Sequence, residues 1–305
     1  MMTAASASLR AGCKINLYLH VGMRLPNGYH RLESLFLPLA EPHDILEIRP
    51  LAGASQGLVR TSFVTACEQE RPISDIDPQH NTLCRAAAWH AEQTGFRPAL
   101  DILVRKGIPH GSGLGGGSSD AAALLLWLRE QAALAGAKLP PFPRFLESAA
   151  TIGADVPFFL QGKTALAEGI GEKLRPAPNP YGGYFLLLLC PGLAVSTSWA
   201  FAALDRERDE KSAPDGLTSE GSQARSSLAC MLKQGNDFES VVFAAYPELE
   251  RLHGQLLQSG ASPARMSGTG SSLFGLYREE KIAREAAKTL ARDGLSVYIQ
   301  YLPEG

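Results

Sequence analysis

A glycine-rich segment directly before an apolar run is the part of the sequence best suited to chemistry. It reads Pro109-His-Gly-Ser-Gly-Leu-Gly-Gly-Gly-Ser-Ser-Asp120 and leads into an alanine- and leucine-rich stretch at 121–128. Glycine lets a backbone bring its N–H groups close to a ligand, and serine and aspartate are residue types that begin helices. The free amides and positive dipole end of a helix N-terminus attract phosphate. The segment therefore predicts a nucleotide phosphate loop, made by Pro109, His110, Gly111, Ser112, Gly113, Leu114, Gly115, Gly116, Gly117, Ser118 and Ser119.

Two better-known phosphate loops do not fit this segment. A Walker A loop needs a lysine after its last glycine, and none follows Gly117. A dinucleotide fingerprint needs an acidic residue about 20 positions later, where this chain has the proline-rich stretch 139–143. A flexible linker is the remaining alternative, and the apolar helix that follows at once disfavours it.

The motif resembles the signature of the GHMP kinase superfamily, Pro-x-x-x-Gly-Leu-Gly-Ser-Ser-x-Ala. Three further segments occur in the expected order. The stretches 14–19 with 27–34, and 153–159, are similar to motifs of one branch of that superfamily, and 267–272 resembles the superfamily's C-terminal glycine motif. The triple glycine at 115–117 is most similar to the branch whose acceptor is a cytidine diphosphate-linked polyol. The resemblance implies transfer of a phosphoryl group from ATP, with Mg²⁺ offsetting the phosphate charge and Ser118 or Ser119 as a hydroxyl contact to the metal. It implies no acidic metal ligand.

The same resemblance implies two catalytic residues, Lys14 and Asp155. Asp155 would accept the proton of the acceptor hydroxyl, and the Lys14 ammonium would favour the ionised carboxylate. Taken alone, Asp155 is more typical of a turn aspartate that caps backbone amides, and Lys14 of a strand-edge lysine facing water, so only the resemblance favours the catalytic roles. The family often has Pro-Ala before this lysine, whereas this chain has Gly12-Cys13. Because the two residues are far apart in the sequence, their meeting is a prediction about the fold.

Acceptor binding is implied for Asn16, Tyr29 and His30. Asn16 would position the acceptor or Asp155, and Tyr29 and His30 would bind the cytosine by stacking and hydrogen bonding. The local alternatives are a plain strand-edge asparagine, a packing tyrosine and a surface histidine. Thr197, Asn236 and Asp237 also match family positions, but helix capping explains them equally well. The turn Gly268-Thr269-Gly270 is a hairpin turn or an additional phosphate contact, and both can hold.

Bulk properties limit the class of protein. The chain has 305 residues, 45% of them hydrophobic, and a net charge of −2, which favours neither nucleic acid nor an anionic membrane as a partner. Its five cysteines include no C-x-x-C pair, and the N-terminus lacks the pattern of a secretory signal. We therefore expect a cytoplasmic protein with reduced thiols and no metal-ligand cluster. The resemblance implies an enzyme with a small-molecule substrate, and we expect a monomeric or weakly dimeric state.

The elements that position these residues follow from periodicity and turn signals. Strands are expected at 12–21, 33–40, 44–49, 58–66, 100–104, 158–160 and 164–167, with helices at 81–95, 118–136 and 143–153. After a junction at 169–183, strands at 184–190, 264–266, 273–277 and 295–301 combine with helices at 196–204, 247–258 and 279–292. That order is β-α-β-β-α-β, the ferredoxin-like arrangement. The polar stretch Arg206–Ser227 is expected to be a mobile surface insertion.

The predicted fold class is α+β with two domains: an N-terminal mixed α/β domain at 1–168 that carries the glycine loop, and a ferredoxin-like domain at 169–305. Two alternatives stay open for the function. One is a related small-molecule kinase whose acceptor has no nucleobase, such as homoserine or mevalonate. The other is a regulator that binds nucleotide without turning it over.

Overall fold

The computed structural model of the protein describes residues 4–67, 69–211, 228–292 and 294–304. The chain forms two compact units. The first combines Met1–Lys14, Pro38–Pro109 and Gly115–Pro176, and the second combines Ile15–Leu37, His110–Leu114 and Ala177–Gly305. These units are defined by compactness and not by independent folding, so the domain boundary between 168 and 169 stays a prediction. Among the described residues, no helix is both long and apolar enough to cross a membrane.

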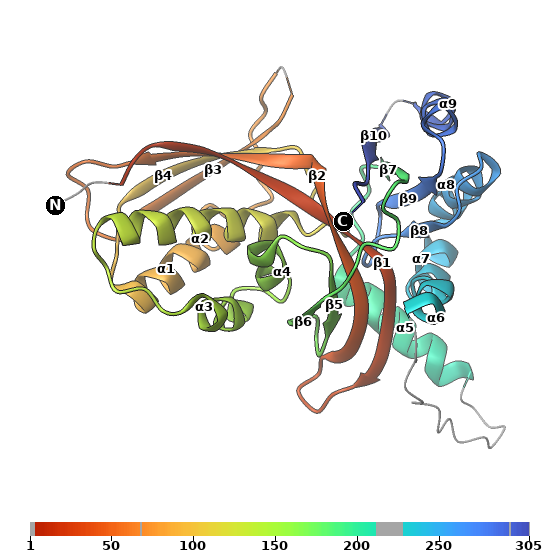
Figure 1. The fold of residues 1–305 in the computed structure, drawn as a ribbon, viewed down its shortest axis with the longest axis horizontal. Coiled ribbons are helices and arrows are strands. Elements are labelled where there is room, and N and C mark those ends of the chain that lie inside the picture. Colours follow the sequence, from red (N-terminus) through yellow and green to blue (C-terminus); the bar gives the residue numbers. More distant parts are fainter. Residues whose placement is uncertain (1–3, 68, 212–227, 293, 305) are drawn as a thin grey trace. The chain divides into compact units, whose positions relative to one another are not determined.

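The first unit is built on a six-stranded sheet with the order β3-β4-β2-β5-β6, in which β1 also pairs with β2. Figure 1 shows α1 and α2 on one side of strands β3 and β4. The two long strands, β1 and β2, supply residues to both units. The elements are β1 Ala7–Arg24, β2 His30–Pro50, β3 Val59–Thr65, α1 Thr82–Thr94, β4 Leu100–Lys106, α2 Gly116–Leu134, α3 Phe142–Ser148, the 3₁₀ turn Ala149–Thr151, α4 Val156–Gln161, β5 Ala165–Glu168 and β6 Lys173–Pro176.

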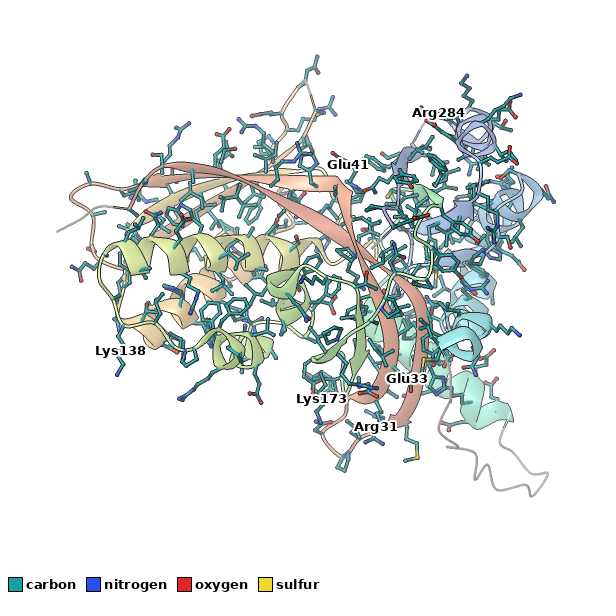
Figure 2. The ribbon with its side chains drawn as sticks, in the orientation of Figure 1. Arg31, Glu33, Glu41, Lys138, Lys173 and Arg284 are labelled. Atoms are coloured by element: carbon teal, nitrogen blue, oxygen red, sulfur yellow. The ribbon has the colours of Figure 1, made fainter. Side chains whose placement is uncertain are left out.

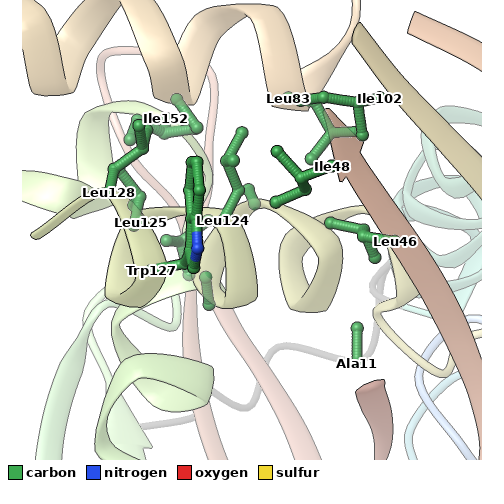
Figure 3. Packing of buried hydrophobic residues seen from close by; sticks show 14 of the residues in the cluster. Ala11, Leu46, Ile48, Leu83, Ile102, Leu124, Leu125, Trp127, Leu128 and Ile152 are labelled. Atoms are coloured by element: carbon green, nitrogen blue, oxygen red, sulfur yellow. The ribbon is translucent and has the colours of Figure 1, made fainter. Parts of the chain in front are cut away.

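Helix α2 organises the core of this unit. Its leucines and Trp127 pack with Ile48 of β2 and Ile102 of β4, as Figure 3 shows. Leu124 and Leu125 are fully buried, which explains why the predicted helix is apolar nearly all round. Helix α1 begins and ends as its sequence predicts: Asn81 accepts hydrogen bonds from the first-turn amides, and Gly95 ends the helix in the left-handed conformation.

The second unit contains a four-stranded antiparallel sheet with the order β10-β7-β9-β8. This is the strand order of a ferredoxin-like fold, so the predicted β-α-β-β-α-β arrangement is confirmed. Apolar positions of α8 and α9, among them Leu252 and Ala283, belong to its core. The elements are β7 Phe185–Cys190, α5 Thr197–Lys211, α6 Leu228–Gln234, α7 Glu239–Ala245, α8 Pro247–Gln258, β8 Ala264–Met266, β9 Leu273–Tyr277, α9 Glu280–Leu290 and β10 Ser296–Tyr301.

Several expectations about elements are wrong. The strands expected at 33–40 and 44–49 are one strand, β2. The segment 158–160 is part of helix α4 and not a strand, because Pro157 lies in the first turn and Gly162 ends the helix in the left-handed conformation. Helix α2 begins two residues early, at Gly116, with Gly115 as its N-cap. The first part of the predicted insertion is helical, since α5 continues to Lys211. The rest of that insertion, 212–227, lies outside the described residues.

Charged side chains follow the expected segregation from the apolar cores. Figure 2 shows Lys138, in the loop after α2, and Arg284 of α9 pointing outward from the ribbon. Arg284 pairs with Glu280 one turn earlier on α9, at 2.6 Å, and both side chains are half or more exposed. Such surface pairs contribute little to stability.

Candidate active site

In the first unit, Lys14 and Asp155 form an ion pair, as the sequence predicts. The Lys14 Nζ atom lies 3.7 Å from Asp155 Oδ2, with 6% of the lysine side chain and 27% of the aspartate side chain exposed. Asp155 directly precedes α4, but its carboxylate makes no capping hydrogen bond. Its alternative role as a turn cap is therefore wrong. The alternative of a water-facing Lys14 is also wrong, because the side chain is buried.

This ion pair lies beside the N-terminus of α2. A Cβ atom on Gly115 would lie 3.4 Å from Lys14 Cγ and 3.0 Å from the Phe159 ring of α4. A Cβ on Gly153 would lie 3.3 Å from the Ser118 hydroxyl. Glycine at both positions thus lets the helix N-terminus, the lysine and the segment before Asp155 approach one another closely. A cation, a carboxylate and a helix N-terminus therefore converge at one place in this unit.

The first turn of α2 presents backbone amides rather than side-chain caps. Ser118 and Ser119 donate their N–H groups to the Gly115 carbonyl, while Gly116 and Gly117 begin the helix. The first amides of a helix have no intrahelical acceptor and point toward the helix N-terminus. The expected capping by Ser118, Ser119 and Asp120 is wrong, because no side chain caps this helix and Ser119 and Asp120 are buried. Pro109, the first residue of the predicted loop, belongs to this same unit.

Asp120 belongs instead to a buried charge cluster that sequence reasoning missed. Lys106, the last residue of β4, pairs with Asp44 and, at 2.9 Å, with Asp120. Asp44 Oδ1 also accepts the N–H groups of Gly107 and Ile108, at 2.7 and 2.8 Å. Burial raises the pKa of Asp120 to about 7, against the lowering effect of Lys106, and the neighbouring Asp44 raises it further. The cluster joins the end of β4, which leads into the glycine loop, to the first turns of α2.

In the second unit, the middle of the glycine loop packs against the turn between β8 and β9. The Ser267 hydroxyl donates to the Gly113 carbonyl at 3.0 Å, and the Ser272 amide donates to the Ser112 carbonyl at 3.1 Å. Gly113 has a φ of +77°, and a Cβ there would collide with the Ser267 carbonyl oxygen. Two glycine motifs that are distant in the sequence therefore hold each other in place.

The remaining loop residues of this unit are Gly111, His110 and Leu114. Gly111 accepts from the Val195 amide at 3.3 Å, Leu114 is buried, and His110 is exposed. The turn Gly268-Thr269-Gly270 connects β8 and β9, which confirms the hairpin interpretation. Its contact with phosphate stays a prediction.

Asn16 is buried and does not face solvent, although among the described strands β1 pairs only with β2. The residue is 3% exposed, and its Nδ2 atom donates a hydrogen bond to the Ser34 hydroxyl at 2.8 Å. Its backbone amide donates to the Ser267 hydroxyl at 3.3 Å. Asn16 therefore lies next to the serine that holds Gly113, and only Ile15 separates it in the chain from Lys14.

The environments of Tyr29 and His30 are the opposite of those expected for a packing tyrosine and a surface histidine. Tyr29 is 60% exposed, so it is not a packing residue, and His30 is 7% exposed, so it is not a surface histidine. His30 Nε2 lies 2.8 Å from Asp205, and its ring stacks on Phe201 with centroids 4.9 Å apart. Both partners come from α5. Apart from their spacing of four residues on one helix, no feature of the sequence identifies Phe201 or Asp205 as a partner of His30.

The other family-matching residues have structural contacts. Asn236 donates to the carbonyls of Met266 and Gly268, at 2.8 and 2.7 Å, and so fixes the β8–β9 turn. Asp237 pairs with His20 at 2.8 Å and Arg208 at 3.0 Å. Thr197 contacts Thr269 through their hydroxyls at 3.3 Å. Capping explains only part of these contacts. Asn236 accepts the Phe238 amide, as a capping residue does, but its donated hydrogen bonds go to the β8–β9 turn.

Family models match both parts of the chain. The model described as GHMP kinases N terminal domain matches residues 81–163, and the one described as GHMP kinases C terminal matches 220–294. The first match covers the predicted phosphate loop and Asp155, and the second covers the β8–β9 glycine turn.

Curated relatives and solved structures agree with these matches. The chain is 44% identical over 298 residues to a 4-diphosphocytidyl-2-C-methyl-D-erythritol kinase of Nitratidesulfovibrio vulgaris, covering 96% of this chain and 98% of that protein. It is 41% identical to the kinase of the same name from Solidesulfovibrio magneticus, over 94% of each chain. A crystal structure of 4-(cytidine 5'-diphospho)-2C-methyl-D-erythritol kinase superimposes with a TM-score of 0.70 at 33% identity, covering 96% of this chain and 98% of that one. Matches of this length show that the chain belongs to the GHMP kinases and, among them, to the 4-diphosphocytidyl-2-C-methyl-D-erythritol kinase family.

Proposed function

We propose that this protein transfers the γ-phosphate of ATP to the 2-hydroxyl of 4-diphosphocytidyl-2-C-methyl-D-erythritol, a step of the non-mevalonate route to isoprenoid precursors. The observation that carries the proposal is the Lys14–Asp155 ion pair beside the N-terminus of α2, in a chain of this family. Phosphoryl transfer needs the phosphates held, their charge offset and the acceptor hydroxyl directed in line. The described residues offer a group for each requirement.

Asp155 accepts the proton of the acceptor hydroxyl as that oxygen attacks the γ-phosphorus. The proton moves to the carboxylate, the new O–P bond forms, and the bond to the leaving ADP oxygen breaks. Lys14 stabilises the negative charge that develops on the attacking oxygen and on the transferred group. Its burial strengthens this effect, because the charge interaction is poorly screened by water.

The amides at the start of α2 bind the ATP phosphates in this proposal. The residues also fit the Mg²⁺ that accompanies ATP: the Ser118 hydroxyl is half-buried at the same helix N-terminus, whereas Ser119 is almost fully buried. Mg²⁺ offsets the charge of the phosphates when bound. No group of three or more acidic, histidine or cysteine side chains in the described ranges is arranged to hold a metal by itself. We therefore assign the metal contact to Ser118.

The cytosine of the acceptor is assigned to Tyr29 and His30. An exposed tyrosine ring can stack on a base, and the buried His30 can present one ring nitrogen to its edge. An acceptor without a nucleobase, such as homoserine or mevalonate, gives these two residues no role.

The test is ADP release from Mg-ATP by the purified protein, with 4-diphosphocytidyl-2-C-methyl-D-erythritol compared with homoserine, mevalonate and galactose. We expect turnover with the cytidyl acceptor alone. Turnover with one of the other acceptors would replace the substrate assignment but keep the mechanism. ATP binding without turnover of any acceptor would instead identify a regulator that retains the fold.

A further inference from the structure

His30 is held by helix α5 in the second unit. Its Nε2 atom lies 2.8 Å from Asp205 Oδ1, and its ring stacks on Phe201 with an interplanar angle of 22°. Phe201 and Asp205 are four residues apart and so lie on one face of α5. Phe201 is itself held edge-on against Phe238, a buried core residue. The imidazole is therefore fixed both in its plane and at one of its two nitrogens.

The contact with Asp205 determines where the proton of the neutral ring resides. An ionised carboxylate can only accept hydrogen bonds, so the His30 Nε2 atom must donate and must carry the proton. The other nitrogen, Nδ1, then has a free lone pair and is an acceptor. Among the described residues, none makes a hydrogen bond to Nδ1, although the histidine is only 7% exposed. One acceptor atom of a nearly buried ring is thus left for a ligand.

We propose that Asp205 is the positioning residue that sets the base preference of the acceptor site, by holding His30 with its Nδ1 atom as a hydrogen-bond acceptor. This inference rests on the function proposed above, in which His30 contacts the cytosine. Cytosine carries an amino group on C4, which donates hydrogen bonds. Uracil carries a carbonyl oxygen at the same position, which accepts them. An acceptor at Nδ1 matches the first base and faces the lone pairs of the second.

The structure predicts discrimination by mismatch as well as by attraction. Two acceptors that face each other lose a hydrogen bond and repel, and a buried site cannot replace the lost partner with water. Without Asp205, the proton can move to Nδ1 and the ring can rotate, so that His30 can present a donor. The site would then accept a diphosphouridyl acceptor more readily and a diphosphocytidyl acceptor less readily.

The first test measures the tautomer directly and needs no ligand. In protein labelled with ¹⁵N-histidine, two-bond nitrogen–proton correlations distinguish the Nε2–H, Nδ1–H and doubly protonated rings, and the His30 signals are identified by their loss in His30→Gln. We expect the Nε2–H form in the wild-type protein and a mixture of tautomers in Asp205→Ala. A wild-type ring that is protonated on Nδ1, or on both nitrogens, overturns the proposal.

The second test separates binding of the base from chemistry. For Asp205→Ala we expect the KM for the diphosphocytidyl acceptor to rise about 10- to 100-fold, with kcat and the KM for ATP within about twofold of wild type. The preference for the diphosphocytidyl over the diphosphouridyl acceptor should fall about tenfold. Asp205→Asn keeps an oxygen that can accept from Nε2 and should restore most of both values. Asp209→Ala removes the same charge from an exposed position on the same helix and should change neither.

The outcomes separate this inference from the proposed function. If wild-type protein fails to turn over the diphosphocytidyl acceptor, the proposed function fails, whatever the tautomer is. If it does turn over that acceptor and Asp205→Ala keeps the wild-type preference for the base, the positioning role of Asp205 is wrong while the function stands. Circular dichroism and the thermal midpoint of each variant identify any that is misfolded. If Asp205→Ala is misfolded, the kinetics of Asp205→Asn and the histidine spectrum of the wild-type protein still test the positioning role of Asp205.

Discussion

At the scale of single residues, the proposed chemistry depends on a charge pair that the chain assembles from distant segments. Lys14 comes from β1 and Asp155 from the residue before α4, and both are at least partly shielded from water. The Asp155 carboxylate is not used for capping, so it is available to a substrate hydroxyl. This distinguishes it from most aspartates in turns, whose side chains bind their own backbone.

Asp155→Asn should lower kcat about 10²- to 10⁴-fold, the range for loss of a positioned general base. Asparagine keeps the shape of the side chain but cannot take the proton, so ATP affinity measured by calorimetry should stay unchanged. Asp75→Asn makes the same change at an exposed loop position and should keep wild-type kcat. Wild-type turnover in Asp155→Asn would remove the base from the mechanism.

His90 of α1 should make the folded state sensitive to mild acid. Burial, with a smaller contribution from the charge of Arg129, lowers the pKa of His90 from 6.5 to about 4. The unfolded chain therefore binds a proton between these values that the folded chain does not, and stability falls as pH falls through that window. From pH 8 to pH 5 the loss from this residue is about 2 kcal/mol.

Urea unfolding at pH 8 and pH 5 measures this effect. His90→Leu, which cannot bind a proton, should lose less stability than wild type over the same interval, by about that amount. His80→Leu provides the control, because His80 is exposed. Equal pH dependence in the wild-type and His90→Leu proteins would contradict the assignment.

At the scale of elements, buried charge connects β4 to helix α2. Lys106 faces two carboxylates, but they are not equivalent. Asp44 accepts two backbone amides as well as the lysine, whereas the Oδ1 atom of Asp120 is buried without a hydrogen-bond partner among the described residues. The ionised form of Asp120 is correspondingly disfavoured, which raises its pKa.

These environments predict opposite results for two isosteric substitutions. Asp44→Asn places an amide donor against the Lys106 ammonium and should lower the free energy of unfolding by about 2 to 3 kcal/mol at pH 8. Asp120→Asn removes a disfavoured charge while Asp44 still pairs with the lysine, and should leave that free energy equal or higher. Urea unfolding of both variants at pH 8 checks the prediction. A larger loss in Asp120→Asn than in Asp44→Asn would contradict it.

The glycine loop depends on a close approach of two turns. Gly113 combines a positive φ with a position where any Cβ meets the Ser267 carbonyl. Gly113→Ala should therefore cost about 1 to 3 kcal/mol of stability and weaken ATP binding. Gly136 also has a positive φ, but a Cβ there meets no atom within 4 Å. Gly136→Ala therefore measures the effect of backbone strain without a steric collision. Calorimetric titration with ATP should show weaker binding for Gly113→Ala only.

At the scale of the whole molecule, the two compact units are interleaved along the chain. Strand β1 contributes Ala11 to one core and Leu19 and Val21 to the other. Strand β2 contributes Ile48 to the first core, and its partly buried Leu32 packs against the second. Losing the structure of either strand would therefore remove residues from both cores. Cooperative unfolding of the described chain follows from this continuity.

We expect a single unfolding transition. The three tryptophans allow a direct test, because Trp89 and Trp127 belong to the first unit and Trp199 to the second. Urea curves of Trp199→Phe and of the Trp89→Phe/Trp127→Phe double variant should have the same cooperativity as the wild type and agree with circular dichroism of the same protein. In either variant, a fluorescence midpoint that differs from the circular dichroism midpoint would show that the units unfold separately.

The sequence by itself determined the family, the fold class and the local elements with strong end signals. Helix α1 carries a side-chain N-cap and a glycine stop, and α8 has proline in its first turn, so both have their predicted extent. The strand expected at Phe158–Leu160 is wrong, because a short apolar run has the same pattern in a strand and in a buried helix. Motif order along the chain also predicted a phosphate loop and the two charged residues that the structure brings together as an ion pair.

Only the tertiary structure decided what those residues touch. No local pattern shows that Lys14 meets Asp155, that Asp120 turns inward to Lys106, or that Asp205 holds His30. Each pair joins segments that are 14 to 175 residues apart, and its geometry depends on how strands and helices pack. Residue type and spacing specify which groups a site can contain. Burial and long-range contacts specify their charge state, their proton positions and therefore their chemistry.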